Sequence, residues 1–246
     1  MSRLRMTYCL GILLRNGLIL ASDSRTNAGV DQIATVSKMT TFETHGERII
    51  TVLSAGNLAT TQAVISQLKQ SYGSGDYHRD LAQSLTLFDA TQKVGDTLRD
   101  VLNRDASFVQ PYGDPAASFL VGGQIRDEEP RLFQVYSAGN FMEASERTPF
   151  LQIGETKYGK PILDRLLTLE TGLAEAAKLA LLSFDATIRS NLSVGPPIDL
   201  MVYGRDSLTS EHLHTFGEDD TYLLTLRQAY AQGLRDLVRG LPVPEV

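Results

Sequence analysis

The amino-acid sequence predicts an α+β protein in which two antiparallel β-sheets pack face to face, each covered by a pair of helices: a four-layer αββα sandwich. Three observations lead to this prediction. An Asn-Gly pair separates two apolar runs near the N-terminus, strand patterns come in blocks, and helical patterns come in pairs between those blocks. A doubly wound parallel fold alternates strands and helices singly, so this order does not fit it.

The first expected element is a β-hairpin built from Tyr8–Leu14 and Leu18–Ala21 around Arg15-Asn16-Gly17. Asn-Gly between apolar runs favours a tight turn, because such a turn needs a positive φ at both central positions. The first strand starts at Thr7 and the second ends near Asp23. We therefore expect these two residues side by side at one end of a sheet.

The remaining elements follow as strands, two helices, strands, two helices, a strand and a helix. Strand patterns cover residues 35–42, 48–53, 118–122, 131–136, 141–144, 150–153 and 197–203. Helical spacing of apolar residues covers 58–68, 79–102, 157–169, 173–189 and a stretch that follows the acidic cap at 218–220. Residues 24–33 and 71–80 are expected to be loops.

Composition bounds the function. A chain of 246 residues without a visible linker predicts one domain over 7–246, with 1–6 as an N-terminal extension. A net charge of −6 argues against a nucleic-acid partner. No apolar run approaches the roughly 20 residues that span a bilayer, and residues 1–6 do not begin a secretory signal. The expected location is the cytoplasm, away from membranes.

Thr7, Asp23 and Lys38 form a candidate nucleophile group. A Thr hydroxyl needs a base, and a Thr at a chain terminus has one in its own α-amine, whose pKa is near ~8. A charged Lys held by an Asp would lower the pKa of that amine further. The same residues also suit structural roles: Thr7 starting a strand, Asp23 capping a turn and Lys38 in solvent.

Other candidates are weaker. The four histidines come without an accompanying Cys or Glu pattern, so neither a metal site nor a cofactor is expected. The lone Cys9 is expected to be a small core residue. Asp199 stands inside an apolar strand pattern; we expect it to be buried and to need hydrogen-bond partners, and assign it no catalytic role.

Short segments in a particular order resemble a known family. They are TYCLGI at Thr7, ASDSRTNAG around Asp23, TVSKM around Lys38 and SAGN at Gly56. The later segments 154–164 and 189–200 fall where that family has further active-site elements. The pattern resembles the proteasome-type N-terminal-nucleophile hydrolases, most of all their Anbu branch, the bacterial ancestral β-subunit. The likeness covers nearly the whole chain.

The resemblance implies a role for each matching residue. Thr7 would be the nucleophile, Lys38 the cation that lowers the pKa of its amine, and Asp23 the partner of Lys38. The Gly56 N–H would stabilise the oxyanion, and Ser193 would lie behind the Thr7 amine. The residues implied at the substrate strand and near the specificity pocket are Thr26, Asn27 and Ser54.

The sequence departs from proteasome β-subunits in three places. Lys38 follows Thr7 by 38 − 7 = 31 positions, one fewer than in the family. Ser190 aligns with a family Asp, and Gly154 with a family Ser. These changes weaken the expected hydrogen bonding around the amine, where Asn191 is a possible polar replacement.

The predicted function is threonine-type hydrolysis of a peptide or other amide bond inside a ring- or spiral-like homo-oligomer. The mechanism needs a free amine on Thr7, so we expect translation to begin at Met6, with residues 1–5 a start-site error and Met6 removed. The alternative is that residues 1–6 are a propeptide. Two alternatives stay open: a non-catalytic scaffold subunit of the same fold, and an amidase acting on a small or γ-linked amide.

Overall fold

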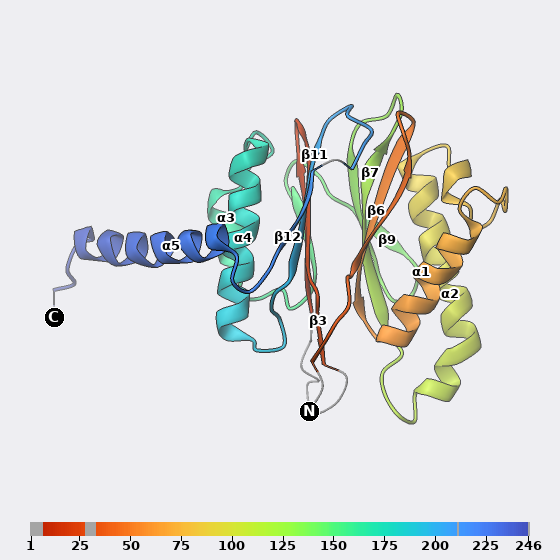
Figure 1. The fold of residues 1–246 in the computed structure, drawn as a ribbon, viewed down its shortest axis with the longest axis horizontal. Helices are drawn as coiled ribbons and strands as arrows, with labels where there is room; N and C mark the ends of the chain where they lie inside the picture. The colour runs from red at the N-terminus through yellow and green to blue at the C-terminus, as the bar shows by residue number, and fades with distance from the viewer. Residues whose placement is uncertain (1–6, 28–32, 211, 246) are drawn as a thin grey trace.

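The computed structural model describes residues 7–27, 33–210 and 212–245. Two five-stranded antiparallel sheets lie face to face, with helices on both outer sides (Figure 1), which confirms the predicted sandwich. The first sheet has the order β10-β1-β2-β11-β12, and the second the order β5-β6-β7-β8-β9. A further two-stranded sheet pairs β3 with β4.

The strands of the first sheet are β10 (Phe150–Gly154), β1 (Tyr8–Leu14), β2 (Gly17–Asp23), β11 (Ile198–Gly204) and β12 (Leu213–Phe216). Those of the second sheet are β5 (Met39–Thr44), β6 (Arg48–Gly56), β7 (Ala117–Ile125), β8 (Arg131–Val135) and β9 (Phe141–Glu143). The small sheet consists of β3 (Arg25–Asn27) and β4 (Ile33–Thr35).

The helices are α1 (Leu58–Ser71), α2 (Leu87–Val109), α3 (Lys160–Leu166), α4 (Leu173–Ser190) and α5 (Thr221–Gly240), with a short 3₁₀ turn at Leu81–Gln83. The pair α1 and α2 covers the second sheet, and α3 and α4 cover the first (Figure 1). Helix α5 runs outward from the α3–α4 layer to the C-terminus.

Strand alternation divides the core into three layers. In β1, Tyr8, Leu10 and Ile12 pack toward α3 and α4, whereas Cys9 packs into the layer between the sheets. The third layer lies between the second sheet and the helices α1 and α2. Because successive side chains point to opposite faces, a strand covered on both sides is apolar throughout, as β1 is. Cys9 is fully buried, as predicted.

The first hairpin is confirmed, but the predicted turn is wrong. Leu14 pairs with Gly17, so the central turn residues are Arg15 and Asn16. Neither has a positive φ, whereas Gly17 has φ +143° at the start of β2. A Cβ on Gly17 would lie 1.9 Å from the Tyr203 carbonyl oxygen. The glycine is therefore required by its own positive φ and by the close approach of the neighbouring strand β11.

Several predicted boundaries move. The helix expected from residue 79 begins at Leu87, after the 3₁₀ turn, and Thr86 caps it by accepting from the Asp89 N–H. The strand expected over 35–42 is broken, and Lys38 stands just before β5. The expected loop at 24–33 contains β3, and residues 28–32 of it lie outside the described part of the chain. Strand β12 had no clear alternating pattern to predict it.

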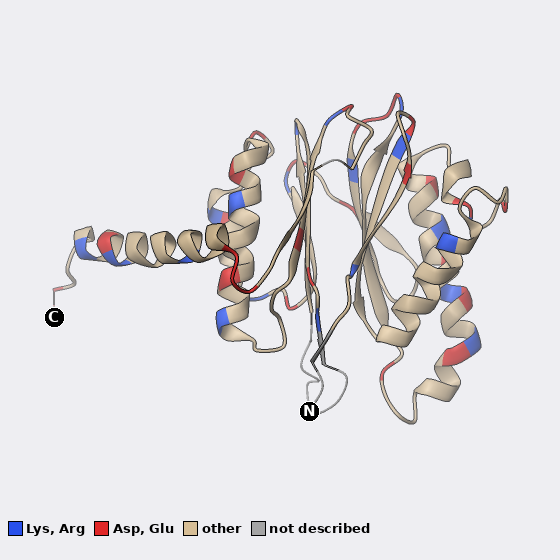
Figure 2. Cartoon of the chain, in the orientation of Figure 1, with Lys and Arg blue, Asp and Glu red and all other residues tan. Residues whose placement is uncertain are grey.

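Charged residues of both signs are spread over the helices and the connections between strands (Figure 2). Few charged residues lie on the facing strands (Figure 2). Buried charged residues include Asp23 and Asp199 in the first sheet, Lys93 on α2 and Asp185 on α4. Within the described residues, no helix is both long and apolar enough to cross a membrane.

Candidate active site

Thr7 and Asp23 meet at one end of the first sheet, as the hairpin predicted. Thr7 directly precedes β1, and Asp23 is the last residue of β2. Thr7 Oγ1 donates a hydrogen bond to Asp23 Oδ1 at 2.8 Å, and the Tyr8 N–H donates to the same oxygen at 3.0 Å. The Thr7 side chain is therefore held in place by a buried carboxylate.

Lys38 completes the group from the other sheet. Its Nζ donates to Asp23 Oδ1 at 2.6 Å and to the Arg25 carbonyl oxygen at 2.7 Å. The side chains of Lys38 and Asp23 are 9% and 0% exposed, so the pair is almost completely shielded from water. The alternative prediction, in which the Lys38 side chain lies in solvent, is therefore wrong.

The electrostatics of Asp23 reflect two opposing influences. Burial raises the pKa of this carboxyl, because a low-dielectric interior disfavours the charged form. The Lys38 ammonium and the donors on Oδ1 oppose that rise. Oδ2 of Asp23 is buried and finds no hydrogen-bond partner among the described residues. The charged form consequently depends on Lys38.

The end of β10 lies directly against Thr7. Gly154 pairs with Tyr8 in the sheet and has φ +83°. A Cβ at this position would lie 2.1 Å from the Thr7 carbonyl oxygen and 2.8 Å from Thr7 Cγ2. The next residue, Glu155, donates its N–H to the Thr7 carbonyl oxygen at 2.7 Å. The glycine at 154 is therefore required by close contact with Thr7.

Ser193 is joined to this region through two other buried polar residues. Its N–H donates to Asn191 Oδ1 at 3.0 Å, and Asn191 Nδ2 donates to Glu155 Oε2 at 3.1 Å. All three side chains are nearly inaccessible to solvent. Glu155 was not predicted as a site residue, although it follows Gly154 directly in a segment that the sequence had marked.

Gly56 and Ser54 lie at the end of β6. The Ser54 N–H donates to the Lys38 carbonyl oxygen at 3.0 Å, and Cys9 Sγ donates to the Ser54 carbonyl oxygen at 3.5 Å. Gly56 has φ +117°, and a Cβ there would lie 2.4 Å from the Ala116 carbonyl oxygen. Asn57 then caps α1 by accepting from the Thr60 N–H.

Thr26 and Asn27 form most of β3, immediately after Arg25, whose carbonyl oxygen accepts from Lys38. In the small sheet they pair with Ala34 and Ile33. Their backbone thus continues directly from the candidate site.

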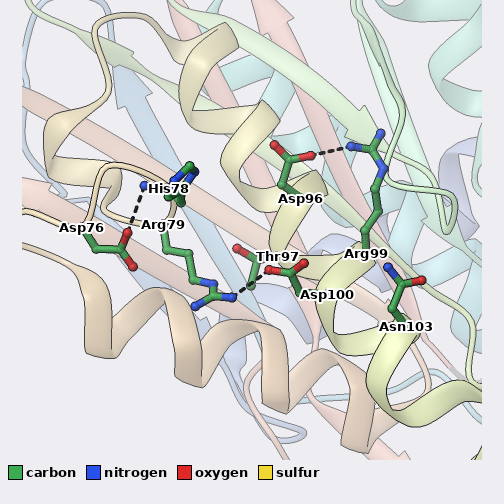
Figure 3. Close-up of a pocket in the computed structure, with 8 residues that line it drawn as sticks. All are labelled: Asp76, His78, Arg79, Asp96, Thr97, Arg99, Asp100 and Asn103. Carbon is green, nitrogen blue, oxygen red and sulfur yellow. Dashed lines mark hydrogen bonds and ion pairs between the residues drawn. The ribbon is translucent and has the colours of Figure 1, made fainter.

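A separate pocket lies beside α2 (Figure 3). Four of its charged lining residues form two ion pairs: Arg79 Nη2 donates to Asp100 Oδ2 at 2.7 Å, and Arg99 bonds Asp96. None of the Thr7 group lines it. In the described ranges, no group of three or more His, Cys, Asp or Glu side chains is placed to hold a metal ion.

The sequence of this chain is similar to those of known proteasome subunits. The family model for proteasome subunits matches residues 6–203. Proteasome subunit beta 2 of Pyrococcus furiosus is 23% identical over 206 residues, 83% of this chain and 90% of that protein.

Solved Anbu structures are closer. The Anbu structure from Yersinia bercovieri has a TM-score of 0.92 and 44% identity, covering 98% of this chain and 99% of its own. The helical assembly of the Anbu complex from Pseudomonas aeruginosa has a TM-score of 0.92 and 49% identity, covering 97% and 98%. The chain therefore belongs to the proteasome subunit family, and within it to the Anbu branch.

Proposed function

We propose that this chain is a threonine-type amide-bond hydrolase that uses the α-amine of a processed Thr7 as its base. The observation that carries the proposal is the convergence of Thr7 Oγ1 and Lys38 Nζ on one buried oxygen of Asp23. Membership of the proteasome-type family supports the same reaction class.

In the proposed reaction, Thr7 Oγ1 attacks the carbonyl carbon of the amide while its proton passes to the α-amine. The Gly56 N–H stabilises the oxyanion that forms. The carbon–nitrogen bond then breaks, and the leaving amine takes the proton from the α-ammonium. Water attacks the resulting Thr7 ester with the α-amine again as base, which releases the acid and restores the hydroxyl.

The charged residues tune that amine. Lys38 would lower its pKa by like-charge repulsion, and Asp23 keeps Lys38 charged and in place. We assign the polar groups behind the amine to Ser193, Asn191 and Glu155, because these buried residues are hydrogen-bonded to one another and to the Thr7 backbone. Thr26, Asn27 and Ser54 remain our proposal for contacts with the substrate.

We propose that the active species is a cytoplasmic homo-oligomer that encloses its active sites. The Pseudomonas aeruginosa relative forms a helical assembly. Here, α5 leaves the body of the subunit (Figure 1). Several of its apolar side chains are exposed, Leu234 and Leu237 among them. We propose that such helical faces form the contacts between subunits, as a ring or a spiral.

The intact mass of the purified protein tests the nucleophile. A version translated from Met6 should lose that residue and leave Thr7 first, and a threonine-selective electrophile should then add one adduct at Thr7 in a Lys38-dependent way. A Thr7→Ala variant should form none. If Met6 or any residue before it is retained, the terminal-amine mechanism is wrong.

The scaffold alternative is favoured by one observation. Ser190, which stands where the family has an Asp, is exposed at the end of α4 and carries no charge toward Thr7. A processed chain that assembles, yet neither hydrolyses amides nor reacts with the electrophile, would support it. Comparing the rates of hydrolysis of peptides and of small γ-linked amides separates the two hydrolase alternatives, a peptidase and an amidase.

A further inference from the structure

Asp199 is a buried carboxylate in the first sheet, at the second position of β11. It lies on β11 between Ile198 and Leu200, both buried, and is itself 8% exposed. Its register partners are Ser22 on β2 and Thr215 on β12. A carboxylate in such a place destabilises the fold unless its oxygens accept hydrogen bonds.

Three hydroxyl groups satisfy Asp199. Oδ1 accepts from Thr215 Oγ1 at 2.7 Å, and Oδ2 accepts from Ser24 Oγ at 3.2 Å and from Ser37 Oγ at 3.1 Å. The Ser37 hydroxyl also lies 3.2 Å from the Met39 carbonyl oxygen, a weaker acceptor than a carboxylate.

The two serines on Oδ2 are sequence neighbours of the charged pair in the candidate site. Ser24 follows Asp23, and Ser37 precedes Lys38. The two segments share a backbone hydrogen bond from the Val36 N–H to the Ser24 carbonyl oxygen, at 2.8 Å. Asp199 Oδ2 is thus a second link between them, and it anchors both to β11.

We propose that Asp199 is a positioning residue for the Asp23–Lys38 pair. By holding Ser24 and Ser37 on one oxygen, it fixes where the Lys38 ammonium lies relative to Thr7. The influence of Lys38 on the Thr7 amine falls with distance, and a displacement of about 1 Å can lower a rate by about 100-fold. This catalytic consequence rests on the proposed function, whereas the geometric link does not.

The chain offers a matched set of variants. Ser37→Ala removes one donor from Oδ2 at an exposed position, and Ser37→Thr keeps the hydroxyl. Thr215→Val removes the donor on Oδ1, which holds neither site segment. Each variant is made in the full homo-oligomer. Asp199 itself is left unchanged, because its replacement would leave Ser24 and Thr215 without their hydrogen-bond acceptor.

The test combines kinetics on a fluorogenic peptide–coumarin amide with crystal structures. Ser37→Ala is expected to lower kcat by about tenfold with KM changed by less than about twofold, since substrate contacts are untouched. Its crystal structure should show Lys38 Nζ displaced from Asp23 Oδ1. Ser37→Thr should restore both, and Thr215→Val should resemble the wild type.

Equal kinetics for Ser37→Ala and the wild type, with Lys38 unmoved, would overturn the proposal. So would a loss of the same size in Thr215→Val, which would indicate a general effect on folding. If the wild type itself neither turns over the amide nor reacts with the electrophile, the proposed function fails. The crystal structures then decide the geometric link alone: Lys38 still on Asp23 in Ser37→Ala overturns it.

Discussion

Lys38 Nζ lies 2.6 Å from Asp23 Oδ1, although one residue lies in the first sheet and the other directly precedes the second. Asp23 ends β2 in the first sheet, and Lys38 stands just before β5 in the second. The pair therefore joins the two sheets at the end where Thr7 lies, and Thr7 donates to the same oxygen. The nucleophile, its carboxylate and the cation depend on one packed junction.

Removing one member of this buried pair should destabilise the fold strongly. Lys38→Met leaves an uncompensated carboxylate and is expected to lower the free energy of unfolding by about 3–5 kcal/mol near neutral pH. Lys160→Met, which breaks the exposed Lys160–Asp164 pair, is the control and should cost at most about 1 kcal/mol. Urea unfolding of both variants measures the difference.

The loss in Lys38→Met should depend on pH. Burial raises the pKa of Asp23, and removing Lys38 removes an opposing influence, so the folded-state pKa rises further. A raised folded-state pKa stabilises the fold in acid, and that contribution is lost as pH rises through it. The deficit should therefore be smallest in acid and grow toward alkaline pH. A deficit in the free energy of unfolding that does not change with pH would contradict this account. So would a deficit of the same size in the double variant Asp23→Asn/Lys38→Met.

Gly154→Ala should damage the site. The new Cβ would lie 2.1 Å from the Thr7 carbonyl oxygen, at a φ of +83°. We expect a loss of about 1–3 kcal/mol in stability from the strained backbone, with a larger loss of electrophile reactivity at Thr7. Gly172→Ala is the control, because nothing lies within 4 Å of its added Cβ and its φ is −66°. Reactivity equal in the two variants would show that Thr7 tolerates the displacement.

Helix α5 should control assembly. Leu234 and Leu237 are 43% and 60% exposed on its apolar side, while the helix is fixed at its start by buried Leu223 and by Arg227 Nε, 2.9 Å from Asp185 Oδ1. Replacing both leucines with Ser should shift the molar mass in light scattering toward smaller species without changing the monomer fold. Gln228→Ser on the same helix should leave the mass unchanged. An unaltered mass in the leucine variant would place the contacts elsewhere.

Cys9 should be unreactive in the folded protein. It is the single cysteine of the chain and is fully buried, and burial raises the pKa of its thiol. A maleimide should label it only at the rate of unfolding, and in denaturant labelling should be rapid. This gives the electrophile experiments an internal check, because an adduct on the native chain is then expected at Thr7. Fast native labelling of Cys9 would contradict the packing between the sheets.

Local patterns determined much of this protein in advance. Strict apolar runs on both sides of a short turn predicted the hairpin that brings Thr7 and Asp23 to one end, and helical spacing predicted the helix pairs. Asn57 and Asp220 do stand at helix N-termini, where each side chain accepts a backbone N–H. The order of short motifs indicated the family. These features can be predicted from the sequence because they arise from residues that are close together in the chain.

Only the tertiary structure decided how the site is completed. Lys38 reaches Asp23 because two sheets pack together, Gly154 is pressed against Thr7 because β10 pairs with β1, and Asp199 collects hydroxyls from residues as far as 175 positions away. Contacts of this kind arise from strand pairing and layer packing between distant segments. They leave no periodic signal in the sequence, since nothing near Asp199 in the chain reveals that Ser24 and Ser37 will be its partners.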